Sequence, residues 1–229
     1  MKHFVKYLVG LGILVAACTS DEFKPADRGL DYFPLKTGLY HIYKVDSIGY
    51  SEVAEPETLA YELMTEVTDS FPNPEGNFTY VISRFKRLDS TSAWQNFDTW
   101  SARVSNREAV VNEGAVSFVK LVFPVVAKSV WDGNKFNSND TDEYEITVFQ
   151  QPYMAGGMTF ESAITVEQEN NEDFIVFLDE RKEVYARGVG LVYKEITQLQ
   201  YCVEDNCRGQ QIIERGTIYK QELIEYGNR

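Results

Sequence analysis

Apolar and polar residues alternate with a period of two in short blocks along most of the chain, and this pattern constrains the fold more than any other feature. In one block, Tyr61, Leu63 and Val67 would lie on one face of a strand. Glu62 and Glu66 would lie on the other, because successive side chains of a β-strand point to opposite faces. Comparable blocks, rich in β-branched and aromatic residues, occupy residues 78–83, 100–105, 143–148 and 160–167. The pattern predicts strands that each bury one face.

Clusters of turn-forming residues separate these blocks, at residues 71–77, 132–134, 137–142, 155–157 and 169–173. About ten to twelve short strands at this spacing predict a mainly β fold, a single antiparallel domain built as a meander, a sandwich or a partly closed barrel. Large side chains for its core are plentiful, since aromatic residues make up 14% of the chain. We expect this domain to span residues 37–229, after a signal peptide and a flexible tether.

The region before Pro124 fits two local structures. A short helix is one interpretation of residues 109–119. Residues 116–123, however, are nearly continuously apolar and end at the proline, which is typical of a strand buried on both faces. We expect the strand at residues 116–123, and the short helix stays open as an alternative.

The first 17 residues have the composition of a secretory signal. Lys2 and Lys6 give a positively charged start, and residues 7–17 are uncharged and mostly apolar. This apolar stretch is too short to cross about 30 Å of hydrocarbon, and no stop-transfer pattern follows it. We therefore predict a secretory signal peptide at residues 1–17 rather than a transmembrane helix.

The signal ends in Val15, Ala16, Ala17 and Cys18. A branched apolar residue, two small residues and a cysteine in this order resemble the lipobox of bacterial lipoproteins. The resemblance implies that the Cys18 thiol carries a diacylglyceryl group and that cleavage falls before this residue. Because several acyl chains hold a protein on a bilayer far more strongly than one does, the resemblance implies a stable lipid anchor and so a lipoprotein signal peptide at residues 1–17. Thr19 follows the cysteine in place of the aspartate of the inner-membrane retention pattern, so we expect a lipid-anchored protein of the outer membrane.

The residues after the cysteine indicate which side of the membrane the protein faces and how it is tethered. Residues 19–22, Thr-Ser-Asp-Glu, resemble the short acidic signal of surface-exposed lipoproteins of Bacteroidota. A solvated acidic linker would have the same composition, so surface and periplasmic orientations both stay open. Residues 18–36 carry Pro25, Gly29, Pro34 and several charges without periodicity, which predicts a flexible tether behind the lipidated Cys18.

Cys202 and Cys207 are the two cysteines that remain after lipidation. In an oxidising envelope, an even pair this close in sequence predicts a disulfide. Strand-like runs at residues 191–201 and 210–224 flank the pair, so we expect the bridge to close the neck of a β-hairpin. The alternative is half of a metal site, but zinc needs four ligands and His41 is the only histidine outside the signal. We predict no metal and no cofactor.

Three further segments, at residues 32–40, 131–137 and 185–193, resemble a group of envelope lipoproteins of Bacteroidota that pair an early Y-x-P-L-x-x-G motif with a late Y-A-x-G-V-G-x-V motif. The resemblance implies a β-rich periplasmic or surface domain of unknown activity, and it brings no catalytic residues with it. Within the last segment, Gly188 and Gly190 permit a positive φ or a close backbone approach at a bend between strands. They do not predict a phosphate-binding loop, because the third glycine of that motif is missing.

The residue content argues against several kinds of chemistry. A formal charge of −13 repels phosphate backbones, so we expect no nucleic-acid partner. A serine hydrolase needs a histidine base, and His41 falls on a predicted strand in a chain without a G-x-S-x-G motif. A glycosidase needs only two carboxylates, and 35 acidic residues leave that class open. The oxygen-rich segments at 137–143 and 167–173 are expected to be solvated turns rather than calcium sites.

These observations predict a lipid-anchored cell-envelope protein without catalytic residues, which binds a protein or glycan partner or serves as an accessory lipoprotein. A carrier that holds an apolar ligand in a curved sheet is one alternative, and a carbohydrate-active enzyme is another. An apolar concavity that side chains leave unfilled would favour the carrier. A filled core with an exposed aromatic patch would favour the partner-binding protein, and two carboxyl groups across a cleft would favour the enzyme.

Overall fold

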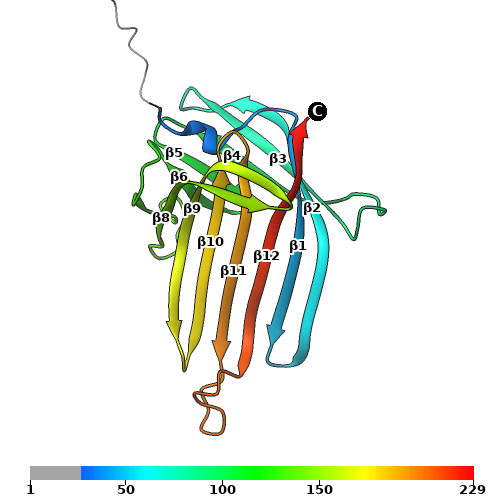
Figure 1. Cartoon of the computed structure of the whole chain (residues 1–229), viewed down its shortest axis with the longest axis vertical. Helices are drawn as coiled ribbons and strands as arrows, with labels where there is room; N and C mark the ends of the chain where they lie inside the picture. The colour runs from blue at the N-terminus through cyan, green and yellow to red at the C-terminus, as the bar shows by residue number, and fades with distance from the viewer. Residues whose placement is uncertain (1–26) are drawn as a thin grey trace, which may run out of the picture.

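The computed structural model describes residues 27–229, so the predicted signal peptide, Cys18 and the acidic segment after it lie outside the described residues. The described part consists of β-strands and one short 3₁₀ helix, η1 (Leu30–Tyr32) (Figure 1). The strands are β1 (Leu39–Ser51), β2 (Ala54–Pro72), β3 (Phe78–Arg87), β4 (Gln95–Val104), β5 (Glu108–Glu113), β6 (Val116–Val122), β7 (Val130–Asp132), β8 (Glu143–Ala155), β9 (Met158–Asp173), β10 (Phe177–Ala186), β11 (Gly190–Tyr201) and β12 (Ile213–Asn228). Within residues 27–229, no helix has the length and apolar character needed to cross a bilayer.

All these strands belong to one antiparallel sheet of 12 strands, in the order β6-β5-β4-β3-β2-β1-β12-β11-β10-β9-β8-β7. Neighbours in the sheet are also neighbours along the chain, except that the last strand, β12, pairs with the first, β1. The sheet is therefore an up-and-down barrel. Its first and last strands are hydrogen-bonded to each other, and its opening lies between β6 and β7, in the middle of the chain.

Three hydrogen bonds bring the two edges of this opening together. The backbone N–H of Val119 donates to the carbonyl of Gly133 at 2.9 Å. The indole N–H of Trp131 donates to the carbonyl of Val119, also at 2.9 Å. The side-chain amide of Asn137 donates to the carbonyl of Ser117 at 2.9 Å. The barrel is thus nearly closed, which confirms the predicted mainly β, antiparallel fold and selects the partly closed barrel among the three architectures.

The strand expected at residues 116–123 is confirmed as β6. The alternative, a short helix at residues 109–119, is excluded, because β5 and β6 pair as a hairpin whose turn contains Gly114 with a φ of +68°. One local prediction is wrong. Residues 169–173 form no turn, because they are the end of β9 and pair with β10. The turn itself follows at residues 174–176. The polar residues of 169–173 are tolerated in a strand because this part of the sheet faces solvent on both sides.

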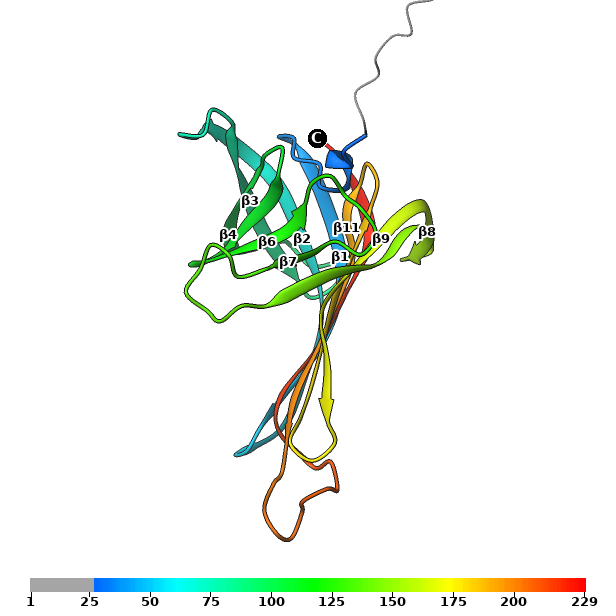
Figure 2. The ribbon, with the colours of Figure 1, turned by 90° about the vertical axis from the view of Figure 1, so that its left-hand side faces the viewer.

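Strands β1, β2, β9, β10, β11 and β12 continue beyond the barrel. They form a thin twisted ribbon (Figure 2). We call this part the blade and define it as residues 46–60 of β1 and β2, 167–182 of β9 and β10, and 195–220 of β11 and β12. Most side chains of the blade are exposed or half-buried. Figure 2 shows the blade edge-on as a single layer, so neither of its faces is covered by a second layer of structure.

The N-terminal segment, residues 27–38, is folded onto the barrel, so the prediction of a flexible tether is wrong for residues 27–36. Tyr32 of η1 is completely buried and shares a hydrogen bond of 2.7 Å with the Ser162 hydroxyl. The Val125 N–H also donates to the carbonyl of Arg28 at 2.9 Å. A short segment can bury one aromatic ring without any helical or strand periodicity, and this is why the sequence pattern did not indicate it.

The buried apolar residues form two clusters. The first packs β5 and β6 against β8, β9 and β10 across the barrel and includes Tyr32 and Trp131. The second joins β1, β2, β11 and β12 to the hairpin of β8 and β9 and includes Tyr43 and Leu223. Between these clusters, the sheet brings together polar side chains from both halves of the chain.

Candidate functional site

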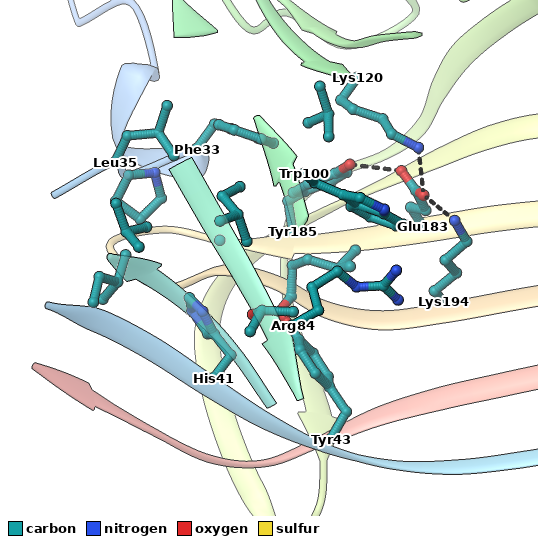
Figure 3. Close-up of a pocket in the computed structure, with 18 of the residues that line it drawn as sticks. Phe33, Leu35, His41, Tyr43, Arg84, Trp100, Lys120, Glu183, Tyr185 and Lys194 are labelled. Atoms are coloured by element: carbon teal, nitrogen blue, oxygen red, sulfur yellow. Dashed lines mark hydrogen bonds and ion pairs between the residues drawn. The ribbon is translucent and has the colours of Figure 1, made fainter. Parts of the chain in front are cut away.

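A pocket lies inside the barrel, between the N-terminal segment and strands from both halves of the chain (Figure 3). It has a volume of about 120 Å³. An apolar cavity of roughly 150 Å³ in another protein accommodates benzene, so this pocket suits a compact ligand of about that size. Apolar side chains make up most of its lining, among them Phe33, Leu35, Leu39, Val67, Ile82 and Leu191.

A cluster of buried charges forms one end of the pocket. Glu183 of β10, which is 1% exposed, lies at its centre. The Nζ atoms of Lys120 on β6 and Lys194 on β11 lie 3.0 and 3.1 Å from Glu183 Oε1. The Tyr185 hydroxyl donates to Glu183 Oε2 at 2.6 Å, and Lys120 also pairs with Glu113 of β5 at 2.8 Å. Each charge of the cluster thus lies beside an opposite charge, as a low-dielectric interior requires.

This cluster stays ionised at neutral pH. Burial alone would raise the pKa of Glu183, but the charges of Lys120 and Lys194 and the Tyr185 hydrogen bond hold that pKa well below its usual range. Burial alone would lower the pKa of Lys120, but the charges of Glu113 and Glu183 raise it above its usual value. A general acid or base works best with a pKa near the operating pH, so these groups are suited to holding charge rather than to transferring protons.

The two carboxylates of the cluster do not match the pair that a glycosidase uses. Burial would raise the pKa of Glu113, but Lys120 and Lys194 outweigh this effect and lower it. Glu113 and Glu183 therefore both have lowered pKa values, whereas a glycosidase needs one carboxyl group with a raised pKa as its general acid.

Arg84 of β3 lines the pocket beside this cluster and is 7% exposed. Its Nη1 donates to both carboxylate oxygens of Asp98, at 2.8 and 3.1 Å. Its guanidinium carbon lies 3.6 Å from the centre of the Trp100 ring, so the side chain is held flat against the indole. Its Nε–H is buried and has no hydrogen-bond acceptor among the described residues.

The early and late sequence motifs meet at the other end of the pocket. The Nε2–H of His41 donates to the carbonyl of Val189 at 2.7 Å. Burial lowers the pKa of His41, and the hydrogen bond to Val189 opposes this only in part, so the ring is neutral at pH 7. The rings of Phe33 and Tyr185 lie 6.0 Å apart. His41 is thus a strand residue whose ring is hydrogen-bonded to a neighbouring loop.

The residues singled out from the sequence lie in different places. Gly188 and Gly190 adopt positive φ values of +74° and +99° at the bend between β10 and β11, and Gly190 lines the pocket. Cys202 and Cys207 form a disulfide at the far end of the blade. The bridge does not close the neck of the β11–β12 hairpin, because Cys202 N–H pairs with the carbonyl of Ile212 there. Among residues 27–229, no group of three or more His, Cys, Asp or Glu side chains is placed to hold a metal ion.

Sequence analysis did not identify the charged residues of the pocket. Lys120 offered a signal, since it is the one charged residue in the apolar run at 116–123. Glu183 offered none, because it follows Glu180, Arg181 and Lys182 and resembles its exposed neighbours. Only the register of the sheet shows that Glu183 faces the barrel interior.

Comparisons with solved structures find matches at low sequence identity. One solved structure is that of a predicted exported protein with a YmcC-like fold from Bacteroides fragilis, at 14% identity and a TM-score of 0.45, covering 86% of this chain and 98% of that one. Another is that of a predicted lipoprotein from Parabacteroides distasonis, at 12% identity and a TM-score of 0.40, with the same coverage of 86% and 98%. No protein-family model matches the chain, and no curated protein matches it.

Proposed function

We propose that this chain is a lipid-anchored protein of the bacterial outer membrane that binds a small, largely apolar ligand inside its partly closed barrel. The observation that carries the binding role is the pocket of about 120 Å³, which side chains leave unfilled although it lies between two buried apolar clusters. Protein interiors are normally packed with few voids larger than a water molecule. A mostly apolar pocket that side chains leave unfilled is typical of ligand-binding sites, and this favours a carrier over a partner-binding protein or a carbohydrate-active enzyme.

Filling the pocket tests the binding role. We expect toluene, a neutral ligand of suitable size, to raise the melting temperature of the natural sequence, because it binds only the folded state. The Val67→Phe variant adds bulk to a residue that lines the pocket, so it should fold and lose this shift. The matched control is Val148→Phe on β8, where Val148 is 41% exposed and does not line the pocket. An unchanged shift in Val67→Phe, or no shift in any of the three proteins, would refute the proposed binding role.

The proposed lipid anchor is inferred from the order of residues 15–18, and a separate experiment tests it. Labelled palmitate should enter the natural protein in a bacterial host and should be absent from the Cys18→Ser variant. Protease treatment of intact cells then distinguishes a surface from a periplasmic orientation. Incorporation of label in Cys18→Ser equal to that in the natural protein would refute lipidation at this residue.

An exposed apolar patch favours a second candidate role, contact with a protein or glycan partner. The patch lies at the end of the blade, and its members come from the β9–β10 turn and the β11–β12 loop. They are Phe174, Ile175, Val176, Val203 and Ile212, with exposed fractions of 66, 45, 43, 42 and 50%. Scattered exposed apolar residues are normal, but a group at one tip is typical of contact surfaces. Substitution of Phe174 and Ile175 by serine should then reduce co-purification of envelope components without affecting binding of toluene.

A further inference from the structure

The charges that line the pocket do not cancel. Arg84, Lys120 and Lys194 contribute three positive charges, and Glu113 and Glu183 contribute two negative charges, which leaves a net charge of +1 on the lining. The whole chain, in contrast, carries a formal charge of −13. An excess positive charge inside so acidic a protein has to be balanced locally, because burial of an isolated charge is unfavourable.

The excess charge belongs to Arg84. Lys120 and Lys194 lie 2.8–3.1 Å from the carboxylates of Glu113 and Glu183, so these two negative charges balance theirs. Arg84 pairs with Asp98, but Asp98 does not line the pocket and its side chain is 38% exposed, so solvent competes for its charge. The pairing also uses Nη1 alone, and the buried Nε–H stays without an acceptor among the described residues.

The position of Arg84 suits recognition of a planar anion. Trp100 holds the guanidinium plane at 3.6 Å, which removes much of the rotational freedom that an arginine side chain loses on binding. A carboxylate can accept hydrogen bonds from two N–H groups of a guanidinium in the same plane. Asp98 accepts hydrogen bonds from Nη1 alone, so Nη2 is left for the carboxylate of a ligand.

The pocket is polar at one end and apolar at the other. Figure 3 shows Lys120, Glu183 and Lys194 together on one side, with the Arg84 guanidinium directed toward them. Phe33 and Leu35 of the N-terminal segment lie on the opposite side. A ligand that fits both ends therefore has a negative group at one end and an apolar body at the other.

Building on the proposed function, we infer that the ligand is a small amphipathic monocarboxylate, with its carboxylate on Arg84 and its apolar body toward Phe33 and Leu35. A monoanion matches the net charge of +1 on the lining, whereas a phosphate dianion would leave a buried negative charge uncompensated. An amine would be repelled by Arg84. The volume of about 120 Å³ sets the size near that of hexanoate or benzoate.

Matched ligands separate this inference from the proposed function. Titration calorimetry at pH 7.5 compares hexanoate with hexan-1-ol, its neutral counterpart of similar size, and with hexylamine. We expect hexanoate to bind at least about tenfold more tightly than hexan-1-ol, and hexylamine to bind most weakly, because hydrogen bonds to charged groups are the strong ones. Equal affinity for hexanoate and hexan-1-ol would overturn the inference and leave the proposed function standing. Failure of both to bind would overturn both.

Three variants test whether the carboxylate of the ligand binds Arg84. Arg84→Gln should bring the affinity ratio of hexanoate to hexan-1-ol close to one. Asp98→Asn removes the competing anion and should raise hexanoate affinity at least about threefold, a gain that a misfolded protein would not show. The charge-matched control is Arg87→Gln, since Arg87 pairs with Glu62 at 2.6 Å and does not line the pocket. An unchanged ratio in Arg84→Gln, a loss of hexanoate affinity in Asp98→Asn, or an equal loss in Arg87→Gln would each overturn the assignment.

Discussion

Single residues in the barrel show how strongly burial decides the role of a charge. Glu145 of β8 and Glu183 of β10 are both glutamates on strands of the same sheet. Glu183, however, is 1% exposed and contacts two lysines and a tyrosine. Glu145 pairs with Lys128 on the surface, with side-chain exposures of 36 and 71%. Removal of one partner from a buried cluster leaves the other charges without compensation, whereas water replaces the partner at the surface.

We therefore predict that Glu183→Gln lowers the free energy of unfolding at pH 7 by about 3 kcal/mol or more. Glu145→Gln should lower it by less than about 1 kcal/mol. The pKa of Glu183 is lowered on folding, so its stabilisation is full above the unfolded value of 4.5 and decreases as the pH falls below it. The difference in the free energy of unfolding between the natural protein and Glu183→Gln should therefore become smaller as the pH falls below 4.5. Urea denaturation at pH 7 and at lower pH measures both effects, and equal losses in the two variants would contradict the prediction.

The secondary-structure elements were predictable where they have one buried face. Blocks such as residues 78–83 and 143–148 alternate because one side of each strand faces the core, and they became parts of β3 and β8. The end of β9 was missed because no face of the blade is covered, so no alternation is needed there. The N-terminal segment was missed because η1 has three residues and its fit depends on distant loops. The pocket was unpredictable for the same reason, since the pairing of β12 with β1 decides which residues face each other.

Glycines in two turns should respond differently to alanine. Gly156, at the turn of β8 and β9, has a φ of +54°, and a Cβ there would collide with the backbone carbonyl of Leu223 on β12. Gly188 has a φ of +74°, but a Cβ there would meet open space. Gly188→Ala should cost about 1 kcal/mol of stability, for backbone strain alone. Gly156→Ala should cost at least about 2 kcal/mol more, because the turn must move away from β12. Thermal and urea denaturation check the difference, and similar losses would contradict the contact.

At the scale of the whole molecule, one sheet serves two structures. In the barrel the sheet curves around a core and brings β6 near β7, and in the blade the same strands continue as a single layer. The strand ladder is continuous from one part to the other. The row of paired residues Asp46, Lys220, Glu195, Lys182 and Glu167 marks the end of the blade next to the barrel, and each of these strands continues past it. Hydrogen bonding is therefore similar in the two parts, and burial of apolar side chains is what distinguishes them.

Hydrogen exchange along β12 should reveal this difference within one strand. Residues 216–218 in the blade and residues 221 and 222 in the barrel pair with both β1 and β11, and residue 223 pairs with β1. Gln221 and Leu223 are buried at 5 and 0% exposure, whereas none of residues 216–218 is buried. Opening the blade exposes little additional apolar surface, so it requires less free energy than opening the barrel. We expect amides 216–218 to exchange at least about tenfold faster than amides 221–223, and hexanoate should slow exchange only in the barrel. Equal protection at the two ends of β12 would show instead that blade and barrel open as one cooperative unit.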